Sequence, residues 1–121
     1  MAKLVDDTVL DGALNIIKNG ATRLIVASGT PTSYATAVAN ALATHIIAAA
    51  DMAVANDASG RKLTVAEQAG ITIDVGGDPT HICLTDGASV LLYQTTCTGA
   101  TLVVANTVTV PAWKINIPDP T

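Results

Sequence analysis

The sequence predicts a mainly β protein, an antiparallel β-sandwich with one N-terminal α-helix. Apolar residues recur with helical spacing near the N-terminus, whereas alternate residues are apolar in several later segments. These two periodicities distinguish an amphipathic helix from half-buried strands. A chain of 121 residues is also the size of one domain with its own core. We therefore predict a single β-sandwich domain over residues 1–121.

The helix is predicted over about residues 7–18. Its apolar residues share one helical face and are Val9, Leu10, Ala13, Leu14 and Ile17. Asp6, Asp7 and Thr8 offer side-chain oxygens that can cap the first turn. Gly20 tolerates positive φ and is predicted to end the helix.

Strands are predicted in three of the segments that follow. Leu24 and Val26 lie on one face of the first strand and Ile25 on the other. Residues 70–77 alternate in the same way, and residues 59–62 form a turn that leads into a short strand. The Ala-rich segment 34–57 is ambiguous, because alanine favours a helix while its neighbours resemble strands. We place a strand or an extended loop there.

A hairpin is predicted around Asp86-Gly87, a preferred pair for a two-residue type I′ turn. Apolar-rich segments lie on both sides of this pair, at residues 80–85 and 88–93. The predicted cross-strand pairs are Thr85 with Ala88, Cys83 with Val90, and His81 with Leu92. Both faces of the hairpin are then largely apolar, as expected inside a sandwich.

The C-terminal segment predicts a bend at Pro111. Val108 and Val110 share one parity, whereas the large apolar residues of 113–117 share the other. A straight strand cannot bury both sets, but a bulge or bend at the proline resets the alternation. Such corners let a strand pass from one sheet to another.

Composition excludes several classes of function. The net charge is −4 and only six Lys and Arg residues are present, so we expect no nucleic-acid partner. We expect no membrane span, because no apolar run reaches about 18 residues, and no signal peptide. Aromatic residues make up 2% of the chain, which disfavours an aromatic-lined ligand pocket.

Two cysteines and a histidine between residues 81 and 97 raise three chemical alternatives. His81 and Cys83 share a strand face, and Cys97 could be a third metal ligand, but the paired ligand spacings of structural zinc sites are absent. A nucleophilic Cys83 would need surroundings that stabilise its thiolate, whereas its predicted neighbour Val90 is apolar and would raise the pKa of the thiol. A Cys83–Cys97 disulfide requires an oxidising compartment. We expect two free thiols and a buried, inert Cys83.

The remaining polar candidates lie outside any catalytic pattern. His45 is isolated, and Asp74, Asp78 and Asp86 fall near turns, where Asp bonds its own backbone. Residues 75–79 form a loop with no helix after it, which argues against a phosphate cradle. We therefore predict no enzymatic activity and no catalytic, cofactor-binding or metal-ligating residues.

The chain resembles a group of small structural proteins encoded in the head-gene region of tailed bacteriophages. The matching positions are Leu10, Asp11, Ala13, Leu14, Asn15, Ile17, Pro31, Thr32, Tyr34, His81, Leu84, Asp86, Gly87, Ile117, Pro118 and Pro120. The matches touch both ends of the chain, and the Ala-rich stretch 35–56 departs from the pattern.

This resemblance implies a jelly-roll-like β-sandwich that acts as a capsid cement or decoration protein. Such a protein binds the outside of the major capsid lattice, forms homodimers or homotrimers, needs no cofactor, and stabilises the assembled state that it binds. It would be made in the host cytoplasm and found on the capsid surface of the virion. The helix or the Pro118-Asp119-Pro120 tail would lie across a neighbouring subunit. The alternatives are a minor tail or fibre-associated virion protein, and a small cellular binding module or hydrolase.

Overall fold

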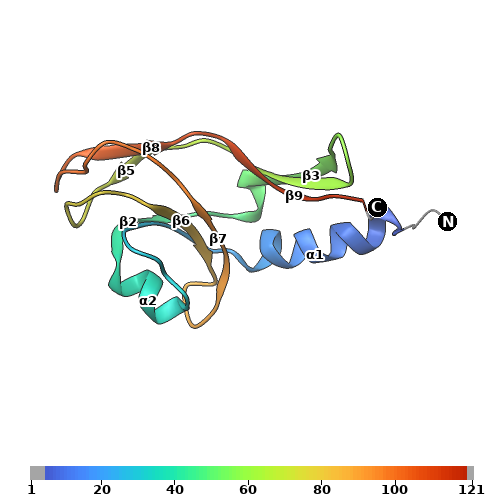
Figure 1. Ribbon diagram of the computed structural model, residues 1–121, viewed down its shortest axis with the longest axis horizontal. Helices are drawn as coiled ribbons and strands as arrows, with labels where there is room; N and C mark the ends of the chain where they lie inside the picture. Colours follow the sequence, from blue (N-terminus) through green and yellow to red (C-terminus); the bar gives the residue numbers. More distant parts are fainter. Residues whose placement is uncertain (1–4, 120–121) are drawn as a thin grey trace.

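A computed structural model describes residues 5–119 and contains mainly β structure (Figure 1). The helices are α1 (Asp7–Gly20), α2 (Tyr34–Ala39) and a short 3-10 helix, η1 (Ala49–Asp51). The strands are β1 (Arg23–Ala27), β2 (Ala41–Ile46), β3 (Met52–Asn56), β4 (Arg61–Val65), β5 (Gln68–Thr72), β6 (His81–Thr85), β7 (Leu91–Thr96), β8 (Thr107–Val110) and β9 (Trp113–Ile117).

The strands form three antiparallel sheets. Their orders are β2-β1-β6-β7, β3-β4-β9 and β5-β8. An isolated bridge between Ala43 and Ile73 places the chain just after β5 beside β2. The prediction of a mainly β, antiparallel fold with one long N-terminal helix is therefore confirmed.

The main core cluster takes residues from α1 and from all three sheets. Its members include Leu14 of α1, Leu24 of β1, Leu63 of β4, Ile71 of β5 and Ile115 of β9. Leu24 and Val26 face this cluster, whereas Ile25 joins a second cluster on the other side of the sheet. The alternation predicted for β1 is confirmed.

The start of helix α1 agrees with the prediction, but its buried face and its C-terminal end differ from it. The Asp6 side chain accepts the Thr8 N–H at 2.9 Å and caps the first turn. Leu10 and Leu14 are buried as α1 packs against β3 and β4 (Figure 1). Val9 and Ala13, predicted on the buried face, are exposed because they lie about a quarter turn away from Leu10 and Leu14.

Gly20 does not end the helix by positive φ. It is the last helical residue, and the chain enters β1 through Ala21, whose N–H donates to the Ile17 carbonyl. A Cβ on Gly20 would lie 3.3 Å from Leu92 Cδ1. The glycine therefore permits close packing of α1 against β7.

The Ala-rich segment contains both helix and strand. Strands β2 and β3 confirm the extended part of the prediction. Helix α2 was not predicted, and it forms because Ser33 and Thr36 make a reciprocal capping box. Ala37 of α2 is buried against Ile25, Ala27 and Cys83, so small residues let the helix lie close on the sheet.

The hairpin is present, but its predicted turn and register are wrong. Gly87 has positive φ and Asp86 does not, so the turn is not type I′. Instead, Asp86 Oδ1 accepts the backbone N–H groups of residues 88, 89 and 90, which makes a five-residue loop. The observed pairs are Thr85 with Leu91, Cys83 with Gln94, and His81 with Thr96.

The corner at Pro111 is confirmed. Strand β8 pairs with β5, and β9 pairs with β4 in a different sheet. Val110 and Ile115 nevertheless both join the main core cluster. The change of parity across residues 111 and 112 therefore keeps both strands facing the core.

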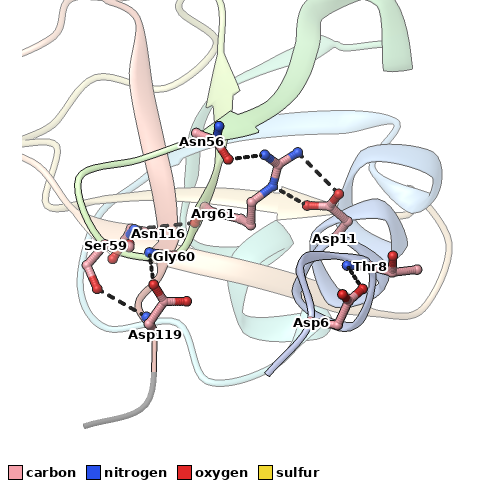
Figure 2. Close-up of polar contacts among 9 residues, drawn as sticks. All are labelled: Asp6, Thr8, Asp11, Asn56, Ser59, Gly60, Arg61, Asn116 and Asp119. Carbon is pink, nitrogen blue, oxygen red and sulfur yellow. Dashed lines mark hydrogen bonds and ion pairs between the residues drawn. The ribbon is translucent and has the colours of Figure 1, made fainter. Parts of the chain in front are cut away.

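One further prediction needs correction. The strand predicted over 70–77 is observed earlier, as β5, and Val75 is 52% exposed in the loop after it. The C-terminal tail, as far as Asp119, binds its own chain because Gly60 N–H donates to Asp119 Oδ2 and Asp119 N–H donates to Ser59 Oγ (Figure 2). Pro120 lies outside the described residues.

Candidate functional site

An apolar cavity of about 570 Å³ lies between the end of β7 and strand β8. Its floor consists of core side chains, among them Val26, Ile82 and Val110. The segment 97–103 and the residues around Pro111 complete its walls, and no charged residue lines it. The cavity is therefore a gap in the core that opens between two sheets.

The cavity borders strand edges as well as side-chain faces. It contacts all four residues of β8, 107–110, and the consecutive residues 95 and 96 of β7. Adjacent side chains of a strand point to opposite faces. A cavity that contacts consecutive residues on a strand therefore extends along its edge.

Both of these edges are unpaired within residues 5–119. Strand β7 has β6 as its only neighbour, and β8 has only β5. Cys97 N–H donates to the Thr80 carbonyl at 2.8 Å. In an antiparallel ladder, every second residue of a strand bonds to the neighbouring strand on that side. Cys97 bonds toward β6, so Thr96 and Gln94 point their backbone N–H and C=O groups away from β6. These groups are free to pair with another strand.

Trp113 closes one end of the cavity. Its ring stacks on Tyr93 of β7 with centroids 5.9 Å apart and planes at 22°. The Trp113 Nε1 atom is buried and has no hydrogen-bond partner. Since buried donors are normally paired, this indole N–H is an unsatisfied donor in a residue that lines the cavity.

The connection from β7 to β8 closes the other end. Leu102 exchanges two backbone hydrogen bonds with Gly77, at 2.8 and 3.1 Å, and the Thr101 hydroxyl donates to Asp78 Oδ1 at 2.6 Å. Ala105 has φ of 72°, the one positive φ at a non-glycine residue within 5–119. This connection is therefore fastened to the 73–78 loop and not to β7.

Exposed valines gather beside this connection. Val75, Val103 and Val104 are 52%, 57% and 55% exposed. They lie close together because Leu102 pairs with Gly77, and a Cβ on Gly76 would lie 3.9 Å from Val104 Cγ2. We refer to these three valines as the apolar tip. In Figure 1 the loops that carry it lie at the end of the molecule opposite the start of α1.

Cys83 and Cys97 lie on opposite sides of the sheet. Both are free thiols; Cys83 is buried under α2, whereas Cys97 packs against the main core and lines the cavity. Burial raises the pKa of Cys83 to about 11 and also raises the pKa of Cys97. The prediction that Cys83 is a buried, free cysteine is confirmed, and its raised pKa favours the neutral thiol, which is a poor nucleophile. Its cross-strand neighbour is Gln94 and not Val90.

The other polar candidates are dispersed. His81 Nδ1 lies 2.9 Å from the Thr80 hydroxyl, and His45 lies across from Leu24 on β2. Three backbone N–H donors to Asp86 lower the pKa of its carboxyl, so Asp86 does bond its own loop. Among residues 5–119, no group of three or more His, Cys, Asp and Glu side chains could hold a metal ion.

A polar network joins the helix, the β3–β4 turn and the C-terminal strand (Figure 2). Arg61 binds Asp11 through two contacts, at 2.7 and 3.2 Å, and also donates to Asn56. The Asn116 amide donates to the carbonyls of Ser59 and Arg61. These groups bind one another, so the network holds the helix, the β3–β4 turn and the C-terminal strand together.

Comparisons of the chain with protein-family models, with curated proteins and with solved structures found no match. None of the helices within residues 5–119 has both the length and the hydropathy of a membrane span.

The cavity was not predicted from the sequence. Its lining is mostly aliphatic and threonine side chains with the single tryptophan, so low aromatic content did not preclude it. One sequence signal pointed to this region, namely Trp113 immediately after the predicted bend at Pro111.

Proposed function

We propose that this chain is a virion structural protein of a tailed bacteriophage, a cement or decoration protein that binds the outside of the major capsid lattice. The observation that carries the proposal is the apolar tip. It places three half-exposed valines at one end of the molecule. Exposed apolar patches of this kind mark protein contacts.

A cement protein acts by burying surface across subunit boundaries and needs no active site. Binding only to the assembled lattice stabilises that state through linkage. The dispersed polar candidates and the buried Cys83 thiol with its raised pKa are compatible with such a role. The resemblance to phage head proteins at residues of α1 and β6 adds to it.

We further propose that the three sheets form a two-layered, jelly-roll-like sandwich. In support, one core cluster combines side chains of β1 and β6 with side chains of β4, β5, β8 and β9. A crystal structure tests this proposal. Sheets that do not face each other across this cluster would contradict it.

Self-association as a dimer or trimer is part of the same proposal. The outer face of α1 carries Val9 and Ile16, 64% and 67% exposed, and is available to a neighbouring copy. Sedimentation equilibrium over a range of protein concentrations measures the mass of the assembly. A monomer at every concentration would remove this part of the proposal.

The decisive experiment is quantitative mass spectrometry of purified phage particles, with copies of this chain counted against the major capsid protein. We expect a ratio of the order of one-half to one, as a repeating lattice site requires. A handful of copies per particle would favour a tail or fibre position. Absence from the particles would reject a virion role.

A further inference from the structure

We propose that the cavity between β7 and β8 accepts an extended, uncharged segment of another protein, which pairs with the free edges of both strands. This inference goes beyond the virion assignment and does not depend on it. It rests on the position of the cavity between two unpaired strand edges.

A strand between β7 and β8 would complete a nearly closed ring of neighbouring strands. The chain after β5 already bridges to β2 through Ile73 and Ala43, and β2, β1, β6 and β7 follow in order. Strand β8 pairs with β5 on the other side of the opening. The gap between β7 and β8 is therefore the place where one strand is missing.

The size of the cavity suits a short strand segment. Strands lie about 4.8 Å apart, rise about 3.3 Å per residue, and occupy a layer about 10 Å thick, which gives roughly 160 Å³ per residue. A cavity of about 570 Å³ therefore holds about three to four extended residues.

The lining defines the chemistry of the occupant. Since no charged residue borders the cavity, a charged side chain inserted there would lose its hydration without compensation. Aliphatic floor residues favour small or β-branched side chains on the inward face. The outward backbone groups of Gln94 and Thr96 offer the main-chain hydrogen bonds of strand addition.

The ends of the described chain lie far from the cavity. The start of α1 and the end of β9 lie at one end of the molecule, whereas the β7–β8 connection lies at the opposite end (Figure 1). This placement favours a segment from a different molecule over a segment adjoining either described end.

The first test is a titration of the ¹⁵N-labelled protein with a synthetic peptide, KGTVTVTGK, followed by NMR. Its central residues are uncharged and β-branched, and the lysines stay outside the cavity for solubility. We expect saturable shifts of the Gln94 and Thr96 amides, the β8 amides and the Trp113 indole. The matched control is the same peptide with N-methylated valines, whose backbone nitrogens cannot donate hydrogen bonds along one edge of the peptide. We expect this control to bind at least tenfold more weakly.

A second test blocks the cavity. Thr109 is exposed and lines it, so Thr109→Trp is expected to abolish the shifts. The control is Thr72→Trp, a change at an exposed threonine on β5 that does not line the cavity, and it should bind normally. Unperturbed spectra of both variants outside the mutated strands establish that they fold.

Three results would overturn the inference. One is the absence of shifts at 5 mM peptide in the wild-type protein. Another is equal binding of the N-methylated peptide, which would indicate a site for small apolar molecules. The third is a concentration-dependent change at β7 and β8 without peptide, which would show that a second copy of the chain fills the gap.

Discussion

The absence of a side chain at Gly60 allows the C-terminal strand to dock on the β3–β4 turn. Gly60 has φ of 73°, and a Cβ there would overlap the Ile117 carbonyl oxygen and lie 2.8 Å from Pro118 Cα. Positive φ is a requirement of the turn, but the close approach comes from another part of the chain. The turn, and with it the need for positive φ, can be predicted from the sequence. The close approach of Ile117 and Pro118 cannot, because it depends on tertiary packing.

Gly60→Ala is therefore expected to lower the free energy of unfolding by roughly 3 kcal/mol, because backbone strain and overlap add. The matched control is Gly70→Ala, at a glycine with φ of 69° and no atom within 4 Å of its added Cβ. That variant should lose only about 1–2 kcal/mol. Urea unfolding measures both, and equal losses would contradict the role of the close approach.

Burial raises the pKa of the Cys83 thiol, so the stability of the fold should depend on pH. Its folded pKa is about 11, raised from an ordinary value near 9.0 by burial under α2. The folded state therefore favours the neutral thiol. Between these two pH values the unfolded chain releases its proton first, so stability is present below pH 9 and is lost as the pH rises toward 11.

In this window the free energy of unfolding should fall by up to about 1.4 kcal/mol per pH unit for the one proton involved. Cys83→Ala removes this group and leaves the other titrating residues, so its slope should be shallower. Denaturant unfolding between pH 8 and 11 provides the comparison. Parallel curves for the wild type and the variant would show that Cys83 titrates normally.

At the scale of elements, the Asp11–Arg61 ion pair joins α1 to the start of β4. The two contacts are 2.7 and 3.2 Å long, and the side chains are 25% and 16% exposed. The Asp11 carboxylate raises the pKa of Arg61, so the guanidinium stays charged. A two-point contact of this geometry fixes the orientation of the helix over the β3–β4–β9 sheet.

Asp11→Asn is expected to lower the midpoint of urea unfolding, because Arg61 keeps its charge and loses its ionic partner. Asp74→Asn removes the same charge at an exposed site for which no side-chain hydrogen bond is found, so its midpoint should stay within error of the wild type. High salt should narrow the difference between the two variants. A larger loss in Asp74→Asn would contradict the proposed role of the pair.

Several features of the helices and strands that depend on neighbouring residues were predicted correctly. The Asp6 cap, the alternation of β1 and the corner at Pro111 were predicted because neighbouring residues determine them. Helix α2 was missed because its capping box, Ser33 and Thr36, lies in a segment where alanine obscured the periodicity. The hairpin register was wrong because Asp86 binds three loop amides, which lengthens the turn.

At the scale of the whole molecule, the apolar tip and the cavity lie at the same end. The connection between β7 and β8 contributes Val103 and Val104 to the tip and forms one wall of the cavity. One end of the molecule therefore offers both an apolar patch and free strand edges. A single partner could engage both features.

If the tip contacts the capsid, Val104→Asp should weaken binding to purified capsids that lack this chain by at least tenfold, because the carboxylate would be desolvated at the contact. The control is Ile46→Asp, at a β2 residue that is 69% exposed, compared with 55% for Val104. Co-sedimentation measures both affinities. Equal affinity of Val104→Asp and the wild type would place the contact elsewhere.

The mainly β class, the N-terminal helix with its cap, and the corner at Pro111 could be predicted from local patterns, since they depend on residues a few positions apart. Long-range packing sets which faces of α1 are buried, how the hairpin pairs, and where the sheets leave a cavity. These features depend on contacts between residues far apart in the chain. The cavity forms because the β7–β8 connection binds the 73–78 loop instead of pairing with β7, leaving both strand edges free.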